Sequence, residues 1–340
     1  MLLDKCFIIA ELSANHGGSL EIAKETVRAA KRAGADAIKL QTYTADTITL
    51  DVKTDYFKIN HGTAWDGQYL YDLYKDASLP WDWHKPLFKL AKEEGLICFS
   101  SPFDKTAVDF LEKENTPIYK VASFEITDIP LIRYIASKQK PIIISTGIAT
   151  IEDIELAITA CKEEGNSQIT ILKCTSAYPA APENANLLTI PDIKKRFGVK
   201  VGLSDHTMGI EAPMIAVALG AQVIEKHFIL DKKIGGADAH FSLDEKQFKK
   251  MVDAVRTTEK LMGNIDYEMT EKKKKSREFS RSLFVVKDVK AGEVITEENI
   301  RSIRPGFGLH PKYYNKIIGK RFTRNISKGE PLVKNMFEGF

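Results

Sequence analysis

The sequence predicts a (β/α)8 TIM barrel followed by a small β-rich domain, on three observations. Eight short apolar runs rich in Ile, Val and Phe recur between residues 7 and 228, helical patterns separate most of them, and polar residues gather at their C-terminal ends. Strands that alternate with helices pair in parallel, and eight such units close a barrel. An open doubly wound sheet is the alternative. The polar strand ends favour the barrel, because barrel enzymes build their active sites there from several strands.

The elements of the predicted barrel follow in chain order. The strands are expected at 7–12, 37–42, 97–102, 119–124, 141–146, 169–174, 201–206 and 223–228. Helices with apolar residues at i, i+3 and i+4 spacing are expected at 20–33, 84–94, 104–114, 130–138, 151–163, 210–219 and 244–262. Five of them are followed by a glycine, at Gly34, Gly95, Gly165, Gly220 and Gly263. A glycine ends a helix without strain because it adopts positive φ.

The pattern changes after residue 263. Residues 264–281 are polar and strongly charged, which indicates a linker, and the lysine run within them is expected to be a solvated surface. Residues 282–340 contain two related phrases, KAGE at 290–293 and SKGE at 327–330, each a glycine-centred turn beside β-rich runs. We therefore predict a barrel domain at 1–263, a linker at 264–281 and a small domain at 282–340. A domain that small buries little core and would gain from a partner surface.

Composition and charge are those of an ordinary soluble protein. Of 340 residues, 44% are apolar and 28% charged, with a net charge of +3, which gives no tendency toward nucleic acid or lipid. The first twelve residues are interrupted by Asp4, Lys5 and Glu11, so they form neither a signal peptide nor a membrane span. The four cysteines are scattered without a CxxC pair, which argues against disulfides and thiolate zinc. We expect a cytoplasmic protein with no nucleic-acid or membrane partner.

Twelve polar residues fall at the C-terminal ends of the predicted strands. They are Glu11, Lys39, Gln41, Ser101, Lys120, Ser123, Ser145, Lys173, Ser204, His206, Glu225 and His227. One such residue is most often a surface or capping group. Twelve distributed around all the strands indicate an active site.

His206 and His227 end neighbouring predicted strands, so a barrel would bring their side chains close together. Two imidazoles without cysteine do not make a closed zinc site, whereas an open site completed by water and substrate would suit a divalent ion such as Mn²⁺. From spacing alone, the two can equally be a polar pair or a base and its orienting group. Asp205 is a candidate to orient His206.

Lys39 and Lys120, beside the strand-end serines, are candidates to bind an anion such as phosphate. The competing chemistry is a Schiff base, as in an aldolase, with Lys120 or Lys173 as the nucleophile. Several lysines beside hydroxyls favour phosphate. Glu11, followed by NHGG at 15–18, is a candidate general base, and pairing with a neighbouring lysine is its alternative role.

Nine stretches of the sequence together resemble the sialic acid synthase family. They are AELSANHGGSLEIAK, GADAIKLQTY, FSSPFD, YKVASFEI, IISTG, AYPAAPENANL, GLSDHTMG, GAQVIEKHF and SIRPGFGL. The resemblance covers nearly the whole chain in order, including a C-terminal stretch similar to antifreeze-like (SAF) domains. It implies an enzyme that condenses phosphoenolpyruvate with an open-chain N-acetylated amino sugar, giving a nine-carbon ulosonic acid and phosphate.

Within the family, a few stretches favour one branch. GTAWDGQYLYDLYKDA at 62–77, PWDWH at 80–84 and ASFEI in place of ASGEI resemble the branch whose acceptor is 2,4-diacetamido-2,4,6-trideoxy-L-altrose. The branches that make legionaminic and N-acetylneuraminic acid share the barrel motifs and are the alternatives. We expect acceptor specificity to lie in the 51–76 loop, Phe124 and the 178–188 segment.

The resemblance also implies a role for each matched residue. The metal ligands would be His206 and His227, holding Mn²⁺, with Mg²⁺ or Co²⁺ as alternatives. The residues that bind phosphoenolpyruvate would be Lys39, Ser101, Lys120, Ser123, Ser145, Ser176 and Ser204. The acceptor sugar would contact Gln41, Tyr178, Asp238 and Arg304. For this reaction, Glu11 is the candidate to orient or deprotonate the water, and Glu225 is a second candidate for proton transfer, as is Glu125. The alternative for these two is a charge pair with Lys226 and Lys120. Ser176 departs from the asparagine of sialic acid synthases, and Arg304 would enter the barrel of the other subunit, which implies a domain-swapped homodimer.

Two other classes of function are open from the sequence. One is a lysine-dependent aldolase, and the other is a binding protein whose C-terminal domain recognises ice or glycans while the barrel is inert. An inert scaffold would have no need of the full set of polar strand ends.

Overall fold

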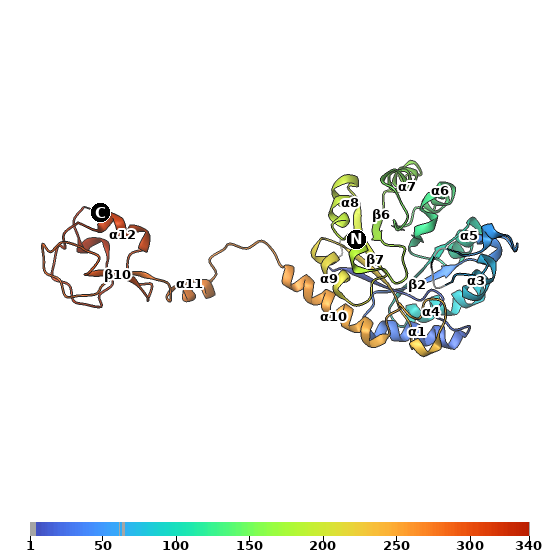
Figure 1. The fold of residues 1–340 in the computed structure, drawn as a ribbon, viewed down its shortest axis with the longest axis horizontal. Coiled ribbons are helices and arrows are strands. Elements are labelled where there is room, and N and C mark those ends of the chain that lie inside the picture. Colours follow the sequence, from blue (N-terminus) through green and yellow to red (C-terminus); the bar gives the residue numbers. More distant parts are fainter. Residues whose placement is uncertain (1–4, 61, 63–64, 340) are drawn as a thin grey trace. The chain divides into compact units, whose positions relative to one another are not determined.

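The computed structural model describes residues 5–60, 62 and 65–339 of the chain. The chain divides into two compact units, residues 1–263 and 264–340, whose outer limits at residues 1 and 340 lie outside the described residues. Figure 1 shows helices arranged around the strands of unit 1. Among the described residues, no helix is both long and apolar enough to cross a membrane.

The described part of unit 1 contains eight parallel strands that close into a barrel. They are β1 (Phe7–Glu11), β2 (Ala37–Thr42), β3 (Ile97–Pro102), β4 (Tyr119–Val121), β5 (Ile142–Ser145), β6 (Ile169–Cys174), β7 (Lys200–Asp205) and β8 (Val223–His227). Each strand pairs with the next in the chain, and β1 pairs with β8. The predicted barrel is confirmed and the open sheet is wrong. β4 is shorter than predicted because the 3-10 helix η3 (Ser123–Thr127) follows it.

The helices of unit 1 lie outside the barrel. The longer ones are α1 (Leu20–Arg32), α3 (Leu70–Ala77), α4 (His84–Glu93), α5 (Lys105–Lys113), α6 (Ile129–Ala136), α7 (Ile151–Glu163), α8 (Thr189–Phe197), α9 (Glu211–Ala218) and α10 (Glu245–Met262), and α2 (Ala45–Ile48) is a single turn. The predicted helices match to within about two residues, and the five predicted glycine stops all have positive φ. The sequence analysis missed α2, α3 and α8. In α8, Pro191 lies in the first turn, where proline is tolerated.

An apolar layer fills the N-terminal half of the barrel interior. Its members point inward from six strands: Phe7, Ile9, Ala37, Phe99, Ile143, Leu172 and Val223. The layer is tightly filled at Gly202 of β7, where a Cβ atom would lie 2.4 Å from the carbonyl oxygen of Val223 and 2.6 Å from Leu172. Because side chains alternate along a strand, the inward residues two positions further on face the C-terminal mouth of the barrel.

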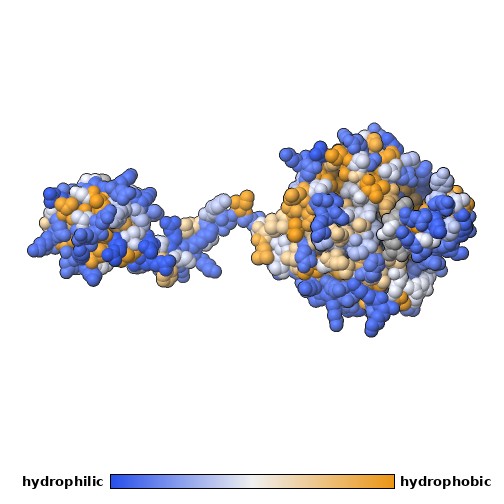
Figure 2. All heavy atoms as spheres, viewed as in Figure 1, coloured by the Kyte–Doolittle hydropathy of each residue, from blue (hydrophilic) through white to orange (hydrophobic). Residues whose placement is uncertain are grey.

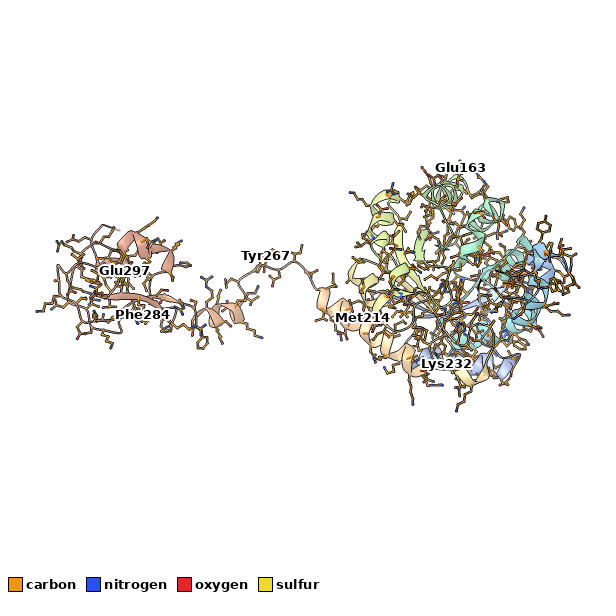
Figure 3. All side chains as sticks on the ribbon, viewed as in Figure 1. Glu163, Met214, Lys232, Tyr267, Phe284 and Glu297 are labelled. Carbon is orange, nitrogen blue, oxygen red and sulfur yellow. The ribbon has the colours of Figure 1, made fainter. Side chains whose placement is uncertain are left out.

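Unit 2 has its own small core around an antiparallel pair, β9 (Ser282–Val285) and β10 (Ile300–Ile303). The helical turns η6 (Pro311–Tyr313), α12 (Tyr314–Ile317) and η7 (Lys334–Met336) complete it. Gly292 and Gly329 have φ of +81° and +94°, so both predicted glycine turns are present. Phe284, labelled in Figure 3, is a buried residue of β9.

Every residue from 261 to 281 is exposed. Tyr267, labelled in Figure 3, is 93% exposed. The lysine run forms the short helix α11 (Glu271–Arg277), capped by the Thr270 side chain, and this helix was not predicted from the sequence. Figure 2 shows hydrophilic atoms along the outlines of both units, as expected of a chain with this charge content.

Candidate active site

The inward side chains at the C-terminal mouth form one polar layer. It contains Glu11, Lys39, Gln41, Ser101, Lys120, Ser145, Cys174, Ser204, Glu225 and His227, in strand order. Except for Gln41 and His227, which are partly buried, all are buried. Polar groups in such positions need partners, because an unpaired buried polar group costs free energy.

Two lysines and two glutamates alternate through the centre of this layer. Lys39 Nζ lies 2.6 Å from Glu11 Oε2 and 3.7 Å from Glu225 Oε1. Lys120 Nζ lies 3.9 Å from Glu225 Oε1, to which the Ser204 hydroxyl also donates over 3.2 Å. The four charged side chains are 1% to 7% exposed. Two charges of each sign offset one another, which is what allows them to be buried together.

The environment separates the two carboxylates in proton affinity. Burial raises the pKa of Glu11 to about 7, even though Lys39 opposes the shift. Burial alone would also raise the pKa of Glu225, but the charges of Lys120 and Lys39 outweigh it and lower that pKa. Glu11 can therefore exchange a proton near neutral pH while Glu225 stays charged. A pair of carboxylates with separated pKa values is typical of acid–base catalysis.

Each lysine of the network also donates to a serine hydroxyl. Lys39 Nζ donates to Ser101 Oγ over 3.3 Å, and Lys120 Nζ donates to Ser145 Oγ over 2.6 Å. An ammonium group beside a hydroxyl offers an entering phosphate both charge and a hydrogen bond.

Ser123 and Ser176 lie beside Gly147, just after β5. The Gly147 N–H donates to Ser123 Oγ over 3.0 Å. A Cβ atom at position 147 would lie 2.0 Å from Ser176 Oγ and 2.7 Å from Ser123 Oγ. Glycine is therefore required for these two hydroxyls to occupy their present positions. The structure thus brings all seven of the residues predicted to bind phosphoenolpyruvate to the same end of the barrel.

His206 and His227 face each other at this end, with their ring centroids 5.3 Å apart. Tyr178 packs against His206 at 4.4 Å, and Phe241 packs against His227 at 4.9 Å. The aromatic rings limit water around the two imidazoles. Phe241 has no place in the sequence-based site, because its position depends on the fold after β8.

The donor atoms of the two histidines fit a divalent cation. His206 Nδ1 donates to the Thr175 carbonyl over 2.9 Å, so Nε2 is the ring nitrogen that would bind a cation once the ring is deprotonated. His227 Nδ1 is buried without a hydrogen bond to the described residues and lies 3.6 Å from Asp238 Oδ2. Burial lowers the pKa of His227 well below its ordinary value, so the ring is neutral, as a ligand must be. No cluster of three or more His, Cys, Asp or Glu residues in the described chain could hold a metal, so an ion here would need water or substrate ligands.

Asp205 does not hydrogen-bond to the His206 ring, contrary to expectation. The alternation along β7 turns Asp205 to the outer face of the barrel, where it pairs with Lys226. The Thr175 carbonyl takes its place as the partner of His206. Glu225 likewise faces Lys39 and Lys120 rather than its sequence neighbour Lys226.

Cys174 belongs to the polar layer, although no role in the site was predicted for it from the sequence. Its Sγ lies 3.3 Å from Ser123 Oγ and 3.9 Å from His206 Nδ1. Burial alone would raise the pKa of the thiol, but these contacts lower it to about 7 and raise the pKa of His206. The sequence feature that could have identified Cys174 is its position two residues after Leu172, because residues two apart in a strand face the same side.

The predicted sugar-binding residues of unit 1 lie at the rim of the same layer. Gln41 Nε2 donates to Glu11 Oε1 over 3.1 Å and to Ser13 Oγ over 3.0 Å. The ring centroids of Tyr178 and Trp65 lie 5.9 Å apart, so the 178–188 segment meets the 51–76 loop. Residues 61, 63 and 64 of that loop lie outside the described residues.

Three residues predicted to take part in the site do not face into the polar layer. Phe124 follows Ser123 and is 58% exposed. Lys173 faces outward from β6, between the inward Leu172 and Cys174, and donates to Thr175 Oγ1. Arg304 is exposed on unit 2. The outward direction of Lys173 argues against it as a Schiff-base lysine in the barrel.

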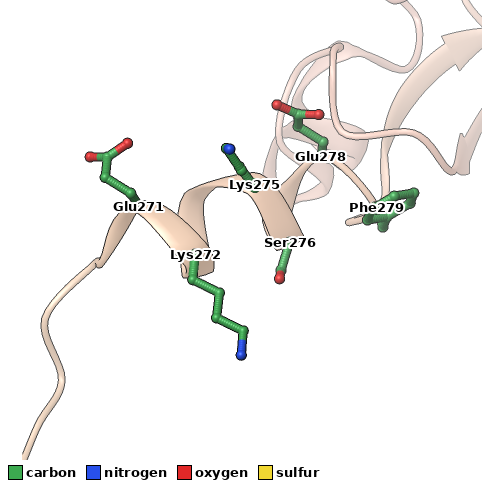
Figure 4. A pocket seen from close by; sticks show the side chains of 6 residues that line it. All are labelled: Glu271, Lys272, Lys275, Ser276, Glu278 and Phe279. Atoms are coloured by element: carbon green, nitrogen blue, oxygen red, sulfur yellow. The ribbon is translucent and has the colours of Figure 1, made fainter.

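A surface depression on α11 lies outside this constellation. Figure 4 shows its lining residues on α11 and on the two residues that follow it: Glu271, Lys272, Lys275, Ser276, Glu278 and Phe279. All are exposed, and none is paired with a second titratable group in a buried setting. The depression lacks the enclosed polar groups that a substrate site requires.

Comparison with known proteins agrees with this geometry. The family model described as the NeuB family matches residues 26–267, and the SAF domain model matches residues 280–338. A pseudaminic acid synthase of Campylobacter jejuni is 51% identical over 333 residues, spanning 98% of this chain and 97% of that protein. An N,N'-diacetyllegionaminic acid synthase of Legionella pneumophila is 38% identical over 335 residues, spanning 96% and 93%. The crystal structure of an N-acetylneuraminic acid synthetase of Leptospira borgpetersenii has a TM-score of 0.71 at 30% identity, spanning 80% of this chain and 90% of that one.

Proposed function

The chain belongs to the NeuB family, and we propose that it catalyses the pseudaminic acid synthase reaction. In this reaction phosphoenolpyruvate condenses with 2,4-diacetamido-2,4,6-trideoxy-L-altrose and water, giving pseudaminic acid and phosphate. The family resemblance and the C-terminal SAF domain found in the sequence are confirmed. The choice of branch is supported by 51% identity to a pseudaminic acid synthase against 38% to a legionaminic acid synthase, each over nearly the whole chain.

One observation carries the catalytic proposal: a buried network of two lysines and two glutamates, ringed by serine hydroxyls, lies at the same end of the barrel as two facing histidines. The lysines and hydroxyls suit the phosphate and carboxylate of phosphoenolpyruvate. The glutamates suit proton transfer. The aldolase alternative is weaker, because the Lys120 ammonium is already engaged by Ser145 and the Val121 carbonyl.

His206 and His227 would hold the divalent cation, with Mn²⁺ as the first candidate and Mg²⁺ or Co²⁺ as alternatives. A cation in this position supplies Lewis-acid polarisation of the acceptor aldehyde. The chain's own contribution is to keep both imidazoles neutral or hydrogen-bonded and to shield them with Tyr178 and Phe241. Gln41, Tyr178 and Asp238 line the rim where the acceptor would bind.

Bond changes follow from these placements. The C2=C3 π pair of phosphoenolpyruvate forms the bond from C3 to the aldehyde carbon. The aldehyde C=O π pair moves to its oxygen, which becomes a hydroxyl by taking up a proton that Glu11 can return, and water adds to the electron-deficient C2. The water proton passes to Glu11, whose raised pKa suits a base that must also release a proton near neutrality. The C2–O bond to phosphate then breaks as the C2 hydroxyl forms the C2=O bond and its proton leaves with the phosphate, whose charge Lys39 and Lys120 neutralise. Glu225, which stays charged, keeps both lysines in position.

We also propose a domain-swapped homodimer in the cytoplasm. Arg304 is exposed on unit 2, where it is available to reach the acceptor site of a second subunit. Unit 2 has a small core and would gain from a partner surface. The four cysteines are buried free thiols, consistent with a reducing compartment.

The test is phosphate release from phosphoenolpyruvate with Mn²⁺ and one of three acceptors. These are the diacetamido-trideoxy-L-altrose, N-acetylmannosamine and the diacetamido-trideoxy-D-mannose. We expect release with the altrose sugar alone. Release only with a manno sugar would move the enzyme to the sialic or legionaminic branch and leave the mechanism standing. No release with any of them would refute the catalytic proposal.

A further inference from the structure

A buried ion pair on the outer face of the barrel joins β7 to β8 one residue before each histidine. Asp205 and Lys226 are Cα partners, and they form the last pair in the β7–β8 register. The Lys226 ammonium donates to the Asp205 carboxylate and, over 2.6 Å, to the Thr207 carbonyl. Both side chains are 1% exposed. Their neighbours on the same strand faces, Leu203 and Ile224, belong to the apolar core.

Stability of the fold does not account for this pair. Removing two charges from water costs free energy that their mutual attraction often fails to repay, and well-packed apolar residues in their place are often as stable or more so. Apart from Thr207, the neighbours on the same strand faces, Leu203 and Ile224, are apolar, so apolar side chains could pack there. A buried ion pair in such a place is better explained by the geometry it imposes.

The geometry that it imposes concerns His206. The β7–β8 ladder stops at Asp205, whereas His227 is still within β8 and is paired with Glu11 of β1. Beyond the ladder, the Asp205 carboxylate accepts hydrogen bonds from Thr207, over 2.9 Å from its N–H and 2.8 Å from its hydroxyl. Asp205 therefore fixes the chain on both sides of His206, and Lys226 fixes Asp205 to the strand that carries His227.

We propose that the Asp205–Lys226 pair is a positioning device that sets the separation of the His206 and His227 imidazoles and thereby the affinity of the site for a divalent cation. The proposal rests on the metal site given under the proposed function. It assigns no contact with substrate to either residue. Its specific consequence is that neutralising the pair weakens cation binding while the fold and the anion-binding residues stay intact.

The test variant is the double substitution Asp205→Asn/Lys226→Met. It removes both charges together, leaves no unpaired buried ion, and keeps an oxygen at position 205 that can accept from Thr207. Binding of Mn²⁺ to metal-free enzyme is followed by the paramagnetic resonance signal of the free ion, without substrate. We expect the Kd for Mn²⁺ to rise by roughly 10- to 100-fold, the range found for residues that orient metal ligands. The thermal midpoint should stay near that of the wild type, and excess Mn²⁺ should restore turnover.

A control is Glu112→Gln/Lys140→Met, which removes a 2.6 Å ion pair that is partly exposed and lies at the opposite, N-terminal end of the barrel. This control should bind Mn²⁺ as the wild type does. If the Asp205→Asn/Lys226→Met protein also binds Mn²⁺ with wild-type affinity, the positioning role is overturned and the metal site itself stands. If His206→Ala binds Mn²⁺ as tightly as the wild type, the metal site is wrong and this inference falls with it.

Discussion

Replacing Glu11 by glutamine should stabilise unit 1 at alkaline pH while it abolishes turnover. Glu11 is 1% exposed, and burial raises its pKa from the ordinary 4.5 to about 7. A raised carboxyl pKa means that the folded state resists ionisation. The stability associated with the protonated form is therefore complete below pH 4.5 and is lost as the pH rises through 7.

The magnitude follows from the shift. A pKa difference of about 2.5 units, at 1.36 kcal/mol per unit, corresponds to a loss of about 3 kcal/mol in the free energy of unfolding at pH 8. At pH 4, below both pKa values, the corresponding loss is only a small fraction of this. Glutamine has the shape of the protonated acid and cannot ionise. Glu11→Gln should therefore match the wild type at pH 4 and exceed it by about 3 kcal/mol at pH 8.

The assay is urea unfolding followed by tryptophan fluorescence at pH 4 and pH 8, with a metal chelator present. The three tryptophans, Trp65, Trp81 and Trp83, all lie in unit 1, so the signal reports on the barrel alone. Glu112→Gln serves as the control of opposite sign. Burial opposes the shift there, but hydrogen bonds from Lys140 and Tyr119 lower the pKa of Glu112, so its charge stabilises the fold and its loss should destabilise at pH 8.

Equal or lower stability of Glu11→Gln at pH 8 would refute the reasoning. It would mean that pairing with Lys39 outweighs burial and that the Glu11 carboxylate is held as an anion. Glu11 would then be a charge partner, the alternative role raised by the sequence, and a general base near neutral pH would have to be sought elsewhere.

Three further predictions concern packing, substrate binding and assembly. Gly202→Ala should lower the free energy of unfolding of unit 1 by about 1–3 kcal/mol in the same fluorescence assay, because the new Cβ atom would overlap the Val223 carbonyl oxygen. An unchanged unfolding midpoint would contradict the tight packing of the apolar layer. Gly147→Ala should raise the KM for phosphoenolpyruvate about tenfold or more without a comparable loss of stability, because the new methyl group displaces the Ser176 hydroxyl. A wild-type KM in steady-state kinetics would show that the Ser123 and Ser176 hydroxyls do not bind this substrate. Arg304→Ala and Glu11→Ala proteins, each inactive alone, should regain partial activity when mixed under conditions that exchange subunits, and no recovery would count against the swapped dimer.

The alternation of strands and helices, the barrel and its active-site end could be predicted from the sequence because they rest on local patterns. Period-two and period-3.6 hydrophobicity is visible in short windows, and a strand end is a local feature. Those patterns placed eight strands and seven helices and selected Lys39, Lys120 and the two histidines. They failed for α8, where two buried isoleucines make a weak pattern, and for α11, which has no buried residue and so no apolar face to detect.

Partners across the barrel were decided only by the tertiary structure. Closure of β1 against β8 and β2 brings Glu11, Lys39 and Glu225 into one buried network, and no local pattern encodes which carboxylate meets which lysine. The same closure raises the pKa of one glutamate and lowers that of the other. It also gives His206 a carbonyl partner rather than Asp205. The residue types and their strand-end positions are properties of the chain, whereas pairing, burial and proton affinity depend on which strand ends the closed barrel brings together.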